Sequence, residues 1–159
     1  MTKKRIIVLD DEHLISVLMK EVIEENQELE VSHIATGQDE FLNLVDKNFF
    51  DAAIIDISIE GSREGGIELL RMMKNRANDL PLIMLSAHDE LYYALRCLQE
   101  GAKGYINKKY ICTDVIRCLK TVLSGHLFVS GDKGERILKQ FMESNVSFEV
   151  RHADFNRRR

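Results

Sequence analysis

Short apolar runs alternate along the chain with longer segments in which apolar residues recur at helical spacing. Continuous apolar runs are typical of strands that are buried on both faces of a parallel sheet. Strands are predicted over residues 6–9, 52–57 and 82–85, with two more mixed ones over 31–35 and 104–106. Helices are predicted over residues 13–25, 39–47, 66–76, 90–100 and 114–124.

The alternation of strand and helix over residues 5–124 predicts five successive βα units. Such units build an α/β fold with right-handed crossovers and helices on both faces of one sheet. In a sheet of this kind, functional side chains gather at the carboxyl ends of the strands. We therefore expect a doubly wound five-stranded parallel sheet with its site at that edge.

Polar side chains stand where the predicted strands end. Asp10 and Asp11 follow the first strand, and Asp56 ends the third after a wholly apolar run. Three carboxylates in one crevice repel one another, and all-oxygen ligation favours Mg²⁺ as the compensating cation. Ser86 ends the fourth strand and Lys108 follows the fifth, where they suit the oxygens of a phosphoryl group. An aspartate that attacks phosphorus forms an aspartyl phosphate, so this edge predicts phosphoryl transfer.

Over residues 4–124 the chain resembles the receiver domain of two-component response regulators. The matching segments are Val-Leu-Asp-Asp at 8–11, Ala-Ile-Ile-Asp at 53–56, Leu-Ile-Met-Leu-Ser-Ala at 82–87 and Gly-Ala-Lys-Gly-Tyr-Ile-Asn-Lys at 101–108. The last two are most similar to regulators that usually carry a LuxR-type or NarL-type helix-turn-helix output. The resemblance implies a flavodoxin-like (βα)5 fold with strand order 2-1-3-4-5.

The resemblance also implies the chemistry of the site. Asp56 would be the phosphoacceptor, and Lys108 would pair with the phosphoryl group. The phosphodonor would be a histidine kinase or a histidine phosphotransfer protein, and the chain would not be a turnover enzyme. The implied ligands of Mg²⁺ are Asp10, Asp11, Asp56 and the backbone carbonyl of Ser58.

Four residues would make and tune the switch. Ser86 would turn toward the phosphoryl group, and Tyr105 would change rotamer as Ser86 moves. Ser58 and His88 hold positions that tune phosphoryl lifetime in receivers, although a solvated loop is an equal alternative for His88. The responding surface would be the face formed by the fourth helix, the fifth strand and the fifth helix.

The sequence departs from the usual receiver pattern at two positions where many receivers have proline. Glu60 stands four residues after Asp56, and Lys109 follows Lys108. The sequence leaves open whether the bond after Lys108 is cis. Residues 61–66 have P-loop glycine spacing without the Lys-Ser/Thr pair, so they are interpreted as a flexible loop. Ser58 stands where aspartate-based phosphatases have an acidic residue, so an efficient phosphatase is not expected. No histidine pair has zinc-ligand spacing, so a zinc site is not expected either.

Charge and composition bear on partners and compartment. The 159 residues carry 22 Lys and Arg against 26 Asp and Glu, a net charge of −4. A mildly acidic domain is a poor nucleic-acid binder, so DNA contacts are expected only through an output domain. No apolar stretch is long enough to span a membrane or to act as a signal peptide. Three cysteines without metal-ligand spacing favour a reducing, cytoplasmic location.

The end of the chain differs from the rest. Residues 125–143 are predicted to form a linker and an extra helix with an apolar stripe over 135–142. Residues 144–159 show little periodicity and end in three arginines, so a flexible basic tail is predicted. The main hypothesis is a switch whose phosphorylation changes a surface for a partner or a homodimer. Two alternatives to it stay open. One is the N-terminal receiver part of a DNA-binding regulator, and the other is a receiver-like module that works without phosphorylation.

Overall fold

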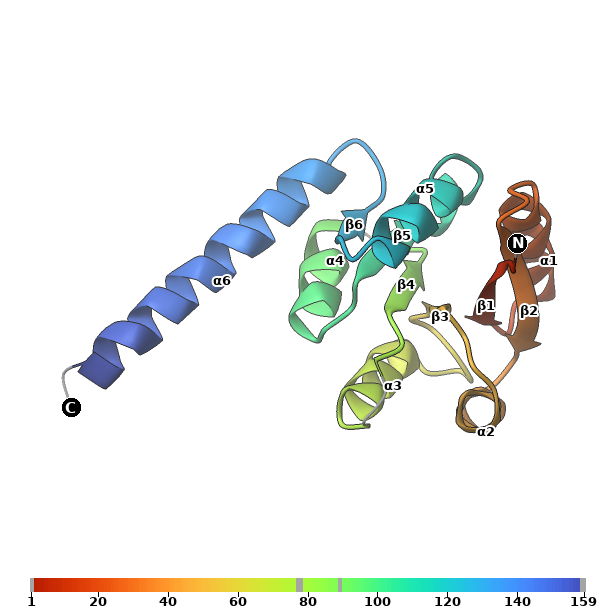
Figure 1. The fold of residues 1–159 in the computed structure, drawn as a ribbon, viewed down its shortest axis with the longest axis horizontal. Coiled ribbons are helices and arrows are strands. Elements are labelled where there is room, and N and C mark those ends of the chain that lie inside the picture. The colour runs from red at the N-terminus through yellow and green to blue at the C-terminus, as the bar shows by residue number, and fades with distance from the viewer. Residues whose placement is uncertain (1, 77–78, 89, 158–159) are drawn as a thin grey trace.

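The computed structural model describes residues 2–76, 79–88 and 90–157 as one α/β sheet with helices on both faces (Figure 1). The strands are β1 (Lys4–Leu9), β2 (Leu29–Ala35), β3 (Ala52–Asp56), β4 (Leu82–Ser86), β5 (Gly104–Asn107) and β6 (Phe128–Val129). The helices are α1 (His13–Glu24), α2 (Gln38–Lys47), α3 (Gly65–Lys74), α4 (Glu90–Gln99), α5 (Ile111–Leu123) and α6 (Gly134–Arg157), with a 3-10 turn, η1 (Lys108–Tyr110), before α5.

All the strands are parallel, in the order β2-β1-β3-β4-β5-β6. The predicted order of the first five is confirmed, but the prediction of a five-stranded sheet is wrong. Gly125, with φ of 89°, turns the chain back after α5. Phe128 then pairs with Gly104 and Val129 with Tyr105 along β5. This short strand satisfies backbone groups of β5 that would otherwise form an open sheet edge.

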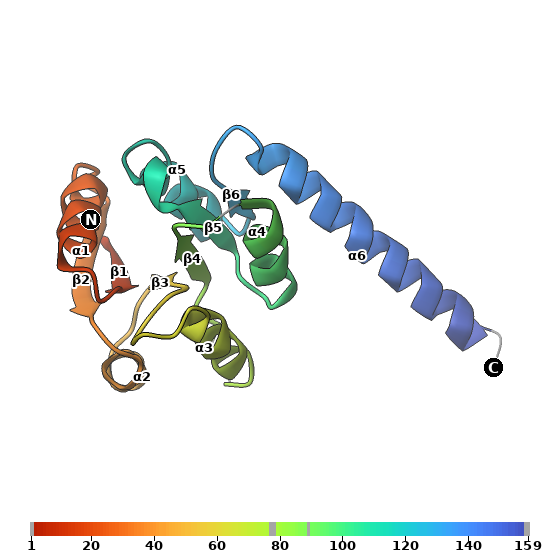
Figure 2. The same ribbon diagram turned by 180° about the vertical axis from the view of Figure 1, so that it is seen from behind.

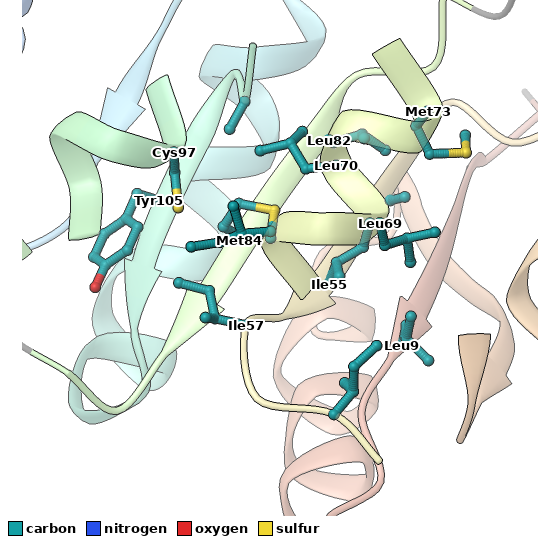
Figure 3. Close-up of a cluster of buried hydrophobic side chains, with 14 of the residues drawn as sticks. Leu9, Ile55, Ile57, Leu69, Leu70, Met73, Leu82, Met84, Cys97 and Tyr105 are labelled. Carbon is teal, nitrogen blue, oxygen red and sulfur yellow. The ribbon is translucent and has the colours of Figure 1, made fainter. Parts of the chain in front are cut away.

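The continuous apolar runs arise because successive strand residues point to opposite, equally covered faces of the sheet. Ile6, Val8 and Ile54 pack with the apolar side chains of α1 and α5. Ile7 and Ile55 pack on the other face with side chains of α2, α3 and α4. Figure 3 shows part of this second cluster, in which residues of α3 and α4 meet the central strands.

Gly66 fixes where α3 begins relative to β3. A Cβ atom at this position would lie 2.2 Å from the backbone oxygen of Asp56, so only glycine fits. Its N–H donates to the oxygen of Ile57 at 2.7 Å. This close approach holds the end of β3 firmly against the first turn of α3.

The C-terminal helix is longer than the sequence predicts. We expected a helix over 135–142 and a flexible tail over 144–159, whereas the backbone of α6 is helical through Arg157. No glycine or proline occurs between Glu135 and Arg157, so no residue there terminates the helix. Arg158 and Arg159 lie outside the described residues. Figures 1 and 2 show α6 starting beside α4 and β6 and then extending well beyond the sheet.

Two further observations concern the chain as a whole. Every peptide bond in the described residues is trans, including the bond after Lys108. Across the same residues, no helix combines the length and the apolar character that a membrane crossing requires.

Candidate functional site

The three aspartates predicted from the strand ends come together at one edge of the sheet. Asp10 and Asp11 follow β1, and Asp56 is the last residue of the neighbouring strand β3. One carboxylate oxygen from each lies within 4.8 Å of the others. Asp10 and Asp56 are buried and Asp11 is exposed. This spacing would let a single cation contact all three carboxylates.

Asp10 is the most constrained of the three. Its side chain is buried, with one oxygen accepting a hydrogen bond from the backbone N–H of Glu12 at 2.8 Å. The other oxygen, Oδ2, has no hydrogen-bond partner among the described residues. Burial is the main cause that raises the pKa of Asp10 to about 7, and the nearby charge of Asp56 also raises it. The hydrogen bond from the backbone of Glu12 lowers this pKa but does not outweigh the burial. A buried carboxylate oxygen that accepts no hydrogen bond is the type of group that a hard cation would satisfy.

Lys108 bridges the cluster from the end of β5. Its Nζ lies 2.8 Å from Oδ2 of Asp56, 2.6 Å from Oε1 of Glu12 and 3.7 Å from Oδ2 of Asp10. Burial by itself would lower the pKa of Lys108, but hydrogen bonds to Asp56 and Glu12 outweigh it and leave the pKa above its ordinary value. The lysine therefore remains a fixed positive charge beside Asp56.

The other face of Asp56 is held by the β3–α3 loop. Its Oδ1 accepts a hydrogen bond from the backbone N–H of Ser58 at 3.1 Å. The hydroxyl of Ser58 donates to the backbone oxygen of Arg63 at 3.0 Å and so closes the loop on itself. Both oxygens of Asp56 thus have a donor, which fixes the orientation of the carboxylate.

Ser86 and Tyr105 meet through the segment after β4. Ser86 is buried beside Asn107, and its hydroxyl accepts from the backbone N–H of His88 at 2.9 Å. The backbone oxygen of His88 accepts from the hydroxyl of Tyr105 at 3.3 Å and from Nδ2 of Asn107 at 2.9 Å. Tyr105 is fully buried, and Figure 3 shows it beside Cys97 of α4. A shift of residues 86–88 would therefore reach both Tyr105 and Asn107.

His88 lies in the segment between β4 and α4 and is partly exposed. Its ring is half-buried and stacks on Tyr93 of α4, with 4.9 Å between ring centroids and 27° between planes. The contact ties the segment after β4 to the helix that follows it. The role of His88 in phosphoryl lifetime stays a prediction.

The family model of the response regulator receiver domain matches residues 6–120 of this chain. The chain belongs to the response regulator receiver family. Its sequence relatives include the response regulator UvrY of Escherichia coli K12, 24% identical over 132 residues that cover 83% of this chain and 60% of the relative. The transcriptional regulatory protein DegU of Brevibacillus brevis is 28% identical over 141 residues, covering 87% of this chain and 58% of the relative. This receiver chain thus spans about 60% of the length of these relatives.

Solved structures show the same fold. A LuxR-family two-component response regulator from Aurantimonas sp. SI85-9A1 matches with a TM-score of 0.76 at 21% identity, over 91% of this chain and 99% of that one. The isolated REC domain of RcsB from Salmonella enterica serovar Typhimurium, in the presence of the phosphomimetic BeF3−, matches with a TM-score of 0.75 at 20% identity. That match covers 86% of this receiver chain and 99% of the RcsB chain.

The sequence did not reveal every polar group around the receiver site. Glu12 contacts Lys108, although its only sequence signal was its position directly after the aspartate pair. Ser130 accepts the backbone N–H of Asn107 at 2.8 Å through its hydroxyl, and this contact links the site edge to β6. Nothing in the local pattern indicated that Ser130 would lie there, because the contact depends on the return of the chain beside β5.

Proposed function

We propose that this receiver domain is a switch that takes a phosphoryl group on Asp56, with Mg²⁺, in a two-component signalling pathway. The observation that carries the proposal is the arrangement around Asp56. Its carboxylate is buried in a three-aspartate cluster and lies 2.8 Å from the ammonium of Lys108. The receiver family supports a phosphohistidine protein, either a histidine kinase or a phosphotransfer protein, as the donor.

In the proposed step, a carboxylate oxygen of Asp56 forms a bond to phosphorus while the bond from phosphorus to the donor nitrogen breaks. The electron pair of the broken bond stays on the donor imidazole, which takes up a proton. Lys108 and the N–H of Ser58 already flank the two oxygens of Asp56. From there Lys108 can move its hydrogen bond onto a phosphoryl oxygen and stabilise the charge on the transferring group.

The residues present fit Mg²⁺. Asp10, Asp11 and Asp56 supply hard oxygen ligands within reach of one ion, and Oδ2 of Asp10, which accepts no hydrogen bond from the described residues, would gain a ligand bond. The backbone carbonyl of Ser58 would complete the protein ligands. A bound Mg²⁺ would supply positive charge toward the phosphoryl oxygens. The domain assists its own phosphorylation and slow dephosphorylation in this proposal and is not a turnover enzyme.

The response would pass through Ser86. When its hydroxyl turns toward the phosphoryl group, it leaves the N–H of His88, and the carbonyl of His88 holds both Tyr105 and Asn107. Phosphorylation would thereby bias one of two arrangements of the α4–β5–α5 face. Ile137 of α6 is buried in the core cluster that includes residues of α4, so α6 begins beside α4. A partner or second copy that binds α4 would therefore also contact α6.

Compartment and output follow from the same proposal. We place the domain in the cytoplasm, where its phosphohistidine donor would act. DNA binding belongs in this proposal to an output domain that is separate from the receiver; dimers of RcsB have been solved bound to DNA. A second candidate is the receiver part of a DNA-binding regulator, which the transcriptional regulatory protein DegU among the sequence relatives supports.

Replacement of the acceptor tests the proposal directly. We expect Asp56→Asn to abolish Mg²⁺-dependent labelling by a small acyl phosphate, because the amide is a far poorer nucleophile than the carboxylate. Phosphate-affinity gel electrophoresis and peptide mass spectrometry measure the label. The control is Asp39→Asn, an exposed aspartate on α2, which should label like the wild type. Persistent labelling of Asp56→Asn would refute the assignment of Asp56 as the acceptor, whereas a wild type that takes no label would favour a module that works without phosphorylation.

A further inference from the structure

Two carboxylates of different character hold Lys108. Asp56 is buried with 2% of its side chain exposed, whereas 59% of the Glu12 side chain is exposed at the mouth of the site. The contact of Nζ with Glu12, at 2.6 Å, is as short as its contact with Asp56, at 2.8 Å. A lysine ammonium has three donors, so these two bonds occupy most of its capacity.

The placement of Glu12 shows that its side chain is directed at the lysine. Glu12 is the N-cap residue of α1, a position where the short side chains of Ser, Thr, Asp and Asn usually accept a backbone N–H of the first turn. Its side chain makes no such capping bond. Its backbone N–H is held by Asp10 at 2.8 Å, which fixes the main chain while the carboxylate reaches across to Lys108.

We infer that Glu12 is a positioning residue that competes with the phosphoryl group for Lys108 and so slows phosphorylation of Asp56. The inference rests on the proposed function and adds to it a rate-setting group. While Glu12 holds Nζ, the ammonium has fewer donors free for an incoming phosphoryl oxygen. The same contact shares the ammonium between Glu12 and Asp56, so Lys108 neutralises less of the aspartate charge that attracts a divalent cation.

Charge acts in the same direction as this competition. Glu12 is a fourth carboxylate beside three aspartates and one lysine, so the mouth of the site carries excess negative charge. A phosphodonor is itself an anion, and like charges raise the cost of its approach. A test must therefore separate the contact with Lys108 from the charge of Glu12.

Two substitutions make that separation. Glu12→Gln removes the charge and weakens the bond to Lys108, whereas Glu12→Asp keeps the charge but shortens the side chain by about 1.5 Å, beyond hydrogen-bond reach. We expect both variants to label with a small acyl phosphate about twofold to fivefold faster than the wild type at saturating Mg²⁺, the size of effect known for an exposed ion pair. Glu21→Gln, an exposed glutamate on α1, controls for net charge.

A second readout needs no phosphodonor. We expect calorimetry to show about twofold to fivefold weaker Mg²⁺ binding in both Glu12 variants, because Lys108 then pairs more fully with Asp56. Acceleration in Glu12→Gln with wild-type behaviour in Glu12→Asp would assign the effect to charge and overturn the competition. Unchanged or slower labelling in both variants would overturn it too. If wild type and both Glu12 variants label Asp56 at equal rates, the competition is overturned but the proposed function stands. If the wild type takes no label, the proposed function itself is refuted.

Discussion

Two buried aspartates of this receiver domain have opposite surroundings. Asp114, on α5, has both oxygens paired, with the backbone N–H of Gly131 at 2.9 Å and the guanidinium of Arg117 at 3.2 Å. Asp10, after β1, leaves Oδ2 without a hydrogen bond among the described residues, 3.7 Å from the ammonium of Lys108. The two residues are nearly equally buried, with 1% of Asp10 and 5% of Asp114 exposed.

The difference separates a structural carboxylate from a functional one. Asp114 holds the turn after β6 against α5, and Ser130 in the same segment holds the end of β5. Every bond it makes is within the domain, so its burial is compensated. An unpaired buried acceptor costs about 1–3 kcal/mol, and Asp10 lies where an external cation could offset that cost. Poor internal pairing at one of two similar residues therefore points to the site.

The largest effect that tests this contrast is expected at Asp10. We predict that Asp10→Asn lowers the rate of Mg²⁺-dependent labelling of Asp56 about 100-fold or more, because a ligand and its charge are lost. The free energy of unfolding without Mg²⁺ should stay equal or rise, since an amide costs less to bury than a charge. Labelling kinetics and urea titrations measure the two quantities. A large loss of stability would show that Asp10 is structural after all.

Asp114 should respond in the opposite way. We predict that Asp114→Ala lowers the free energy of unfolding by about 1–2 kcal/mol, because the half-buried N–H of Gly131 loses its acceptor. Asp114→Asn keeps an acceptor oxygen and should lose less. The bond to the exposed Arg117 contributes little to either value. Urea unfolding measures the change, and labelling of Asp56 should stay within about twofold of wild type in both variants. A large loss of labelling would place Asp114 in the phosphorylation chemistry.

The smallest expected effect is a difference in pH dependence. Burial raises the pKa of Asp10 from 3.8 to about 7, so the folded state keeps a proton that the unfolded state releases. Stability contributed by this group is therefore lost as pH rises between those values, by at most about 1.4 kcal/mol per unit. We predict that wild type loses more stability than Asp10→Asn between about pH 5 and pH 7 in chelator, and that Mg²⁺ reduces the difference. Parallel pH profiles in urea titrations would contradict it.

Much of the site could be predicted because it depends on strand ends. Parallel strands bring their carboxyl ends to one edge, so Asp10, Asp11 and Asp56 had to converge once the strands were assigned. Ser130 and Asp114 could not be paired with that edge from sequence, since β6 is two residues long and follows no periodic pattern. The full length of α6 was not predicted either, because the prediction relied on an apolar stripe that covers only residues 135–142. The backbone of α6 continues as a helix beyond that stripe.

The sequence by itself determined the alternation of strands and helices, the two-sided burial of the sheet and the edge at which the carboxylates meet. These follow from local periodicity and from the fixed direction of parallel strands. Only the tertiary structure decided that a sixth strand extends the sheet beside β5, that α6 begins against α4, and that Glu12 contacts Lys108. Those contacts join residues far apart in the chain, and their geometry is set by how the packed elements meet rather than by any residue's neighbours in sequence.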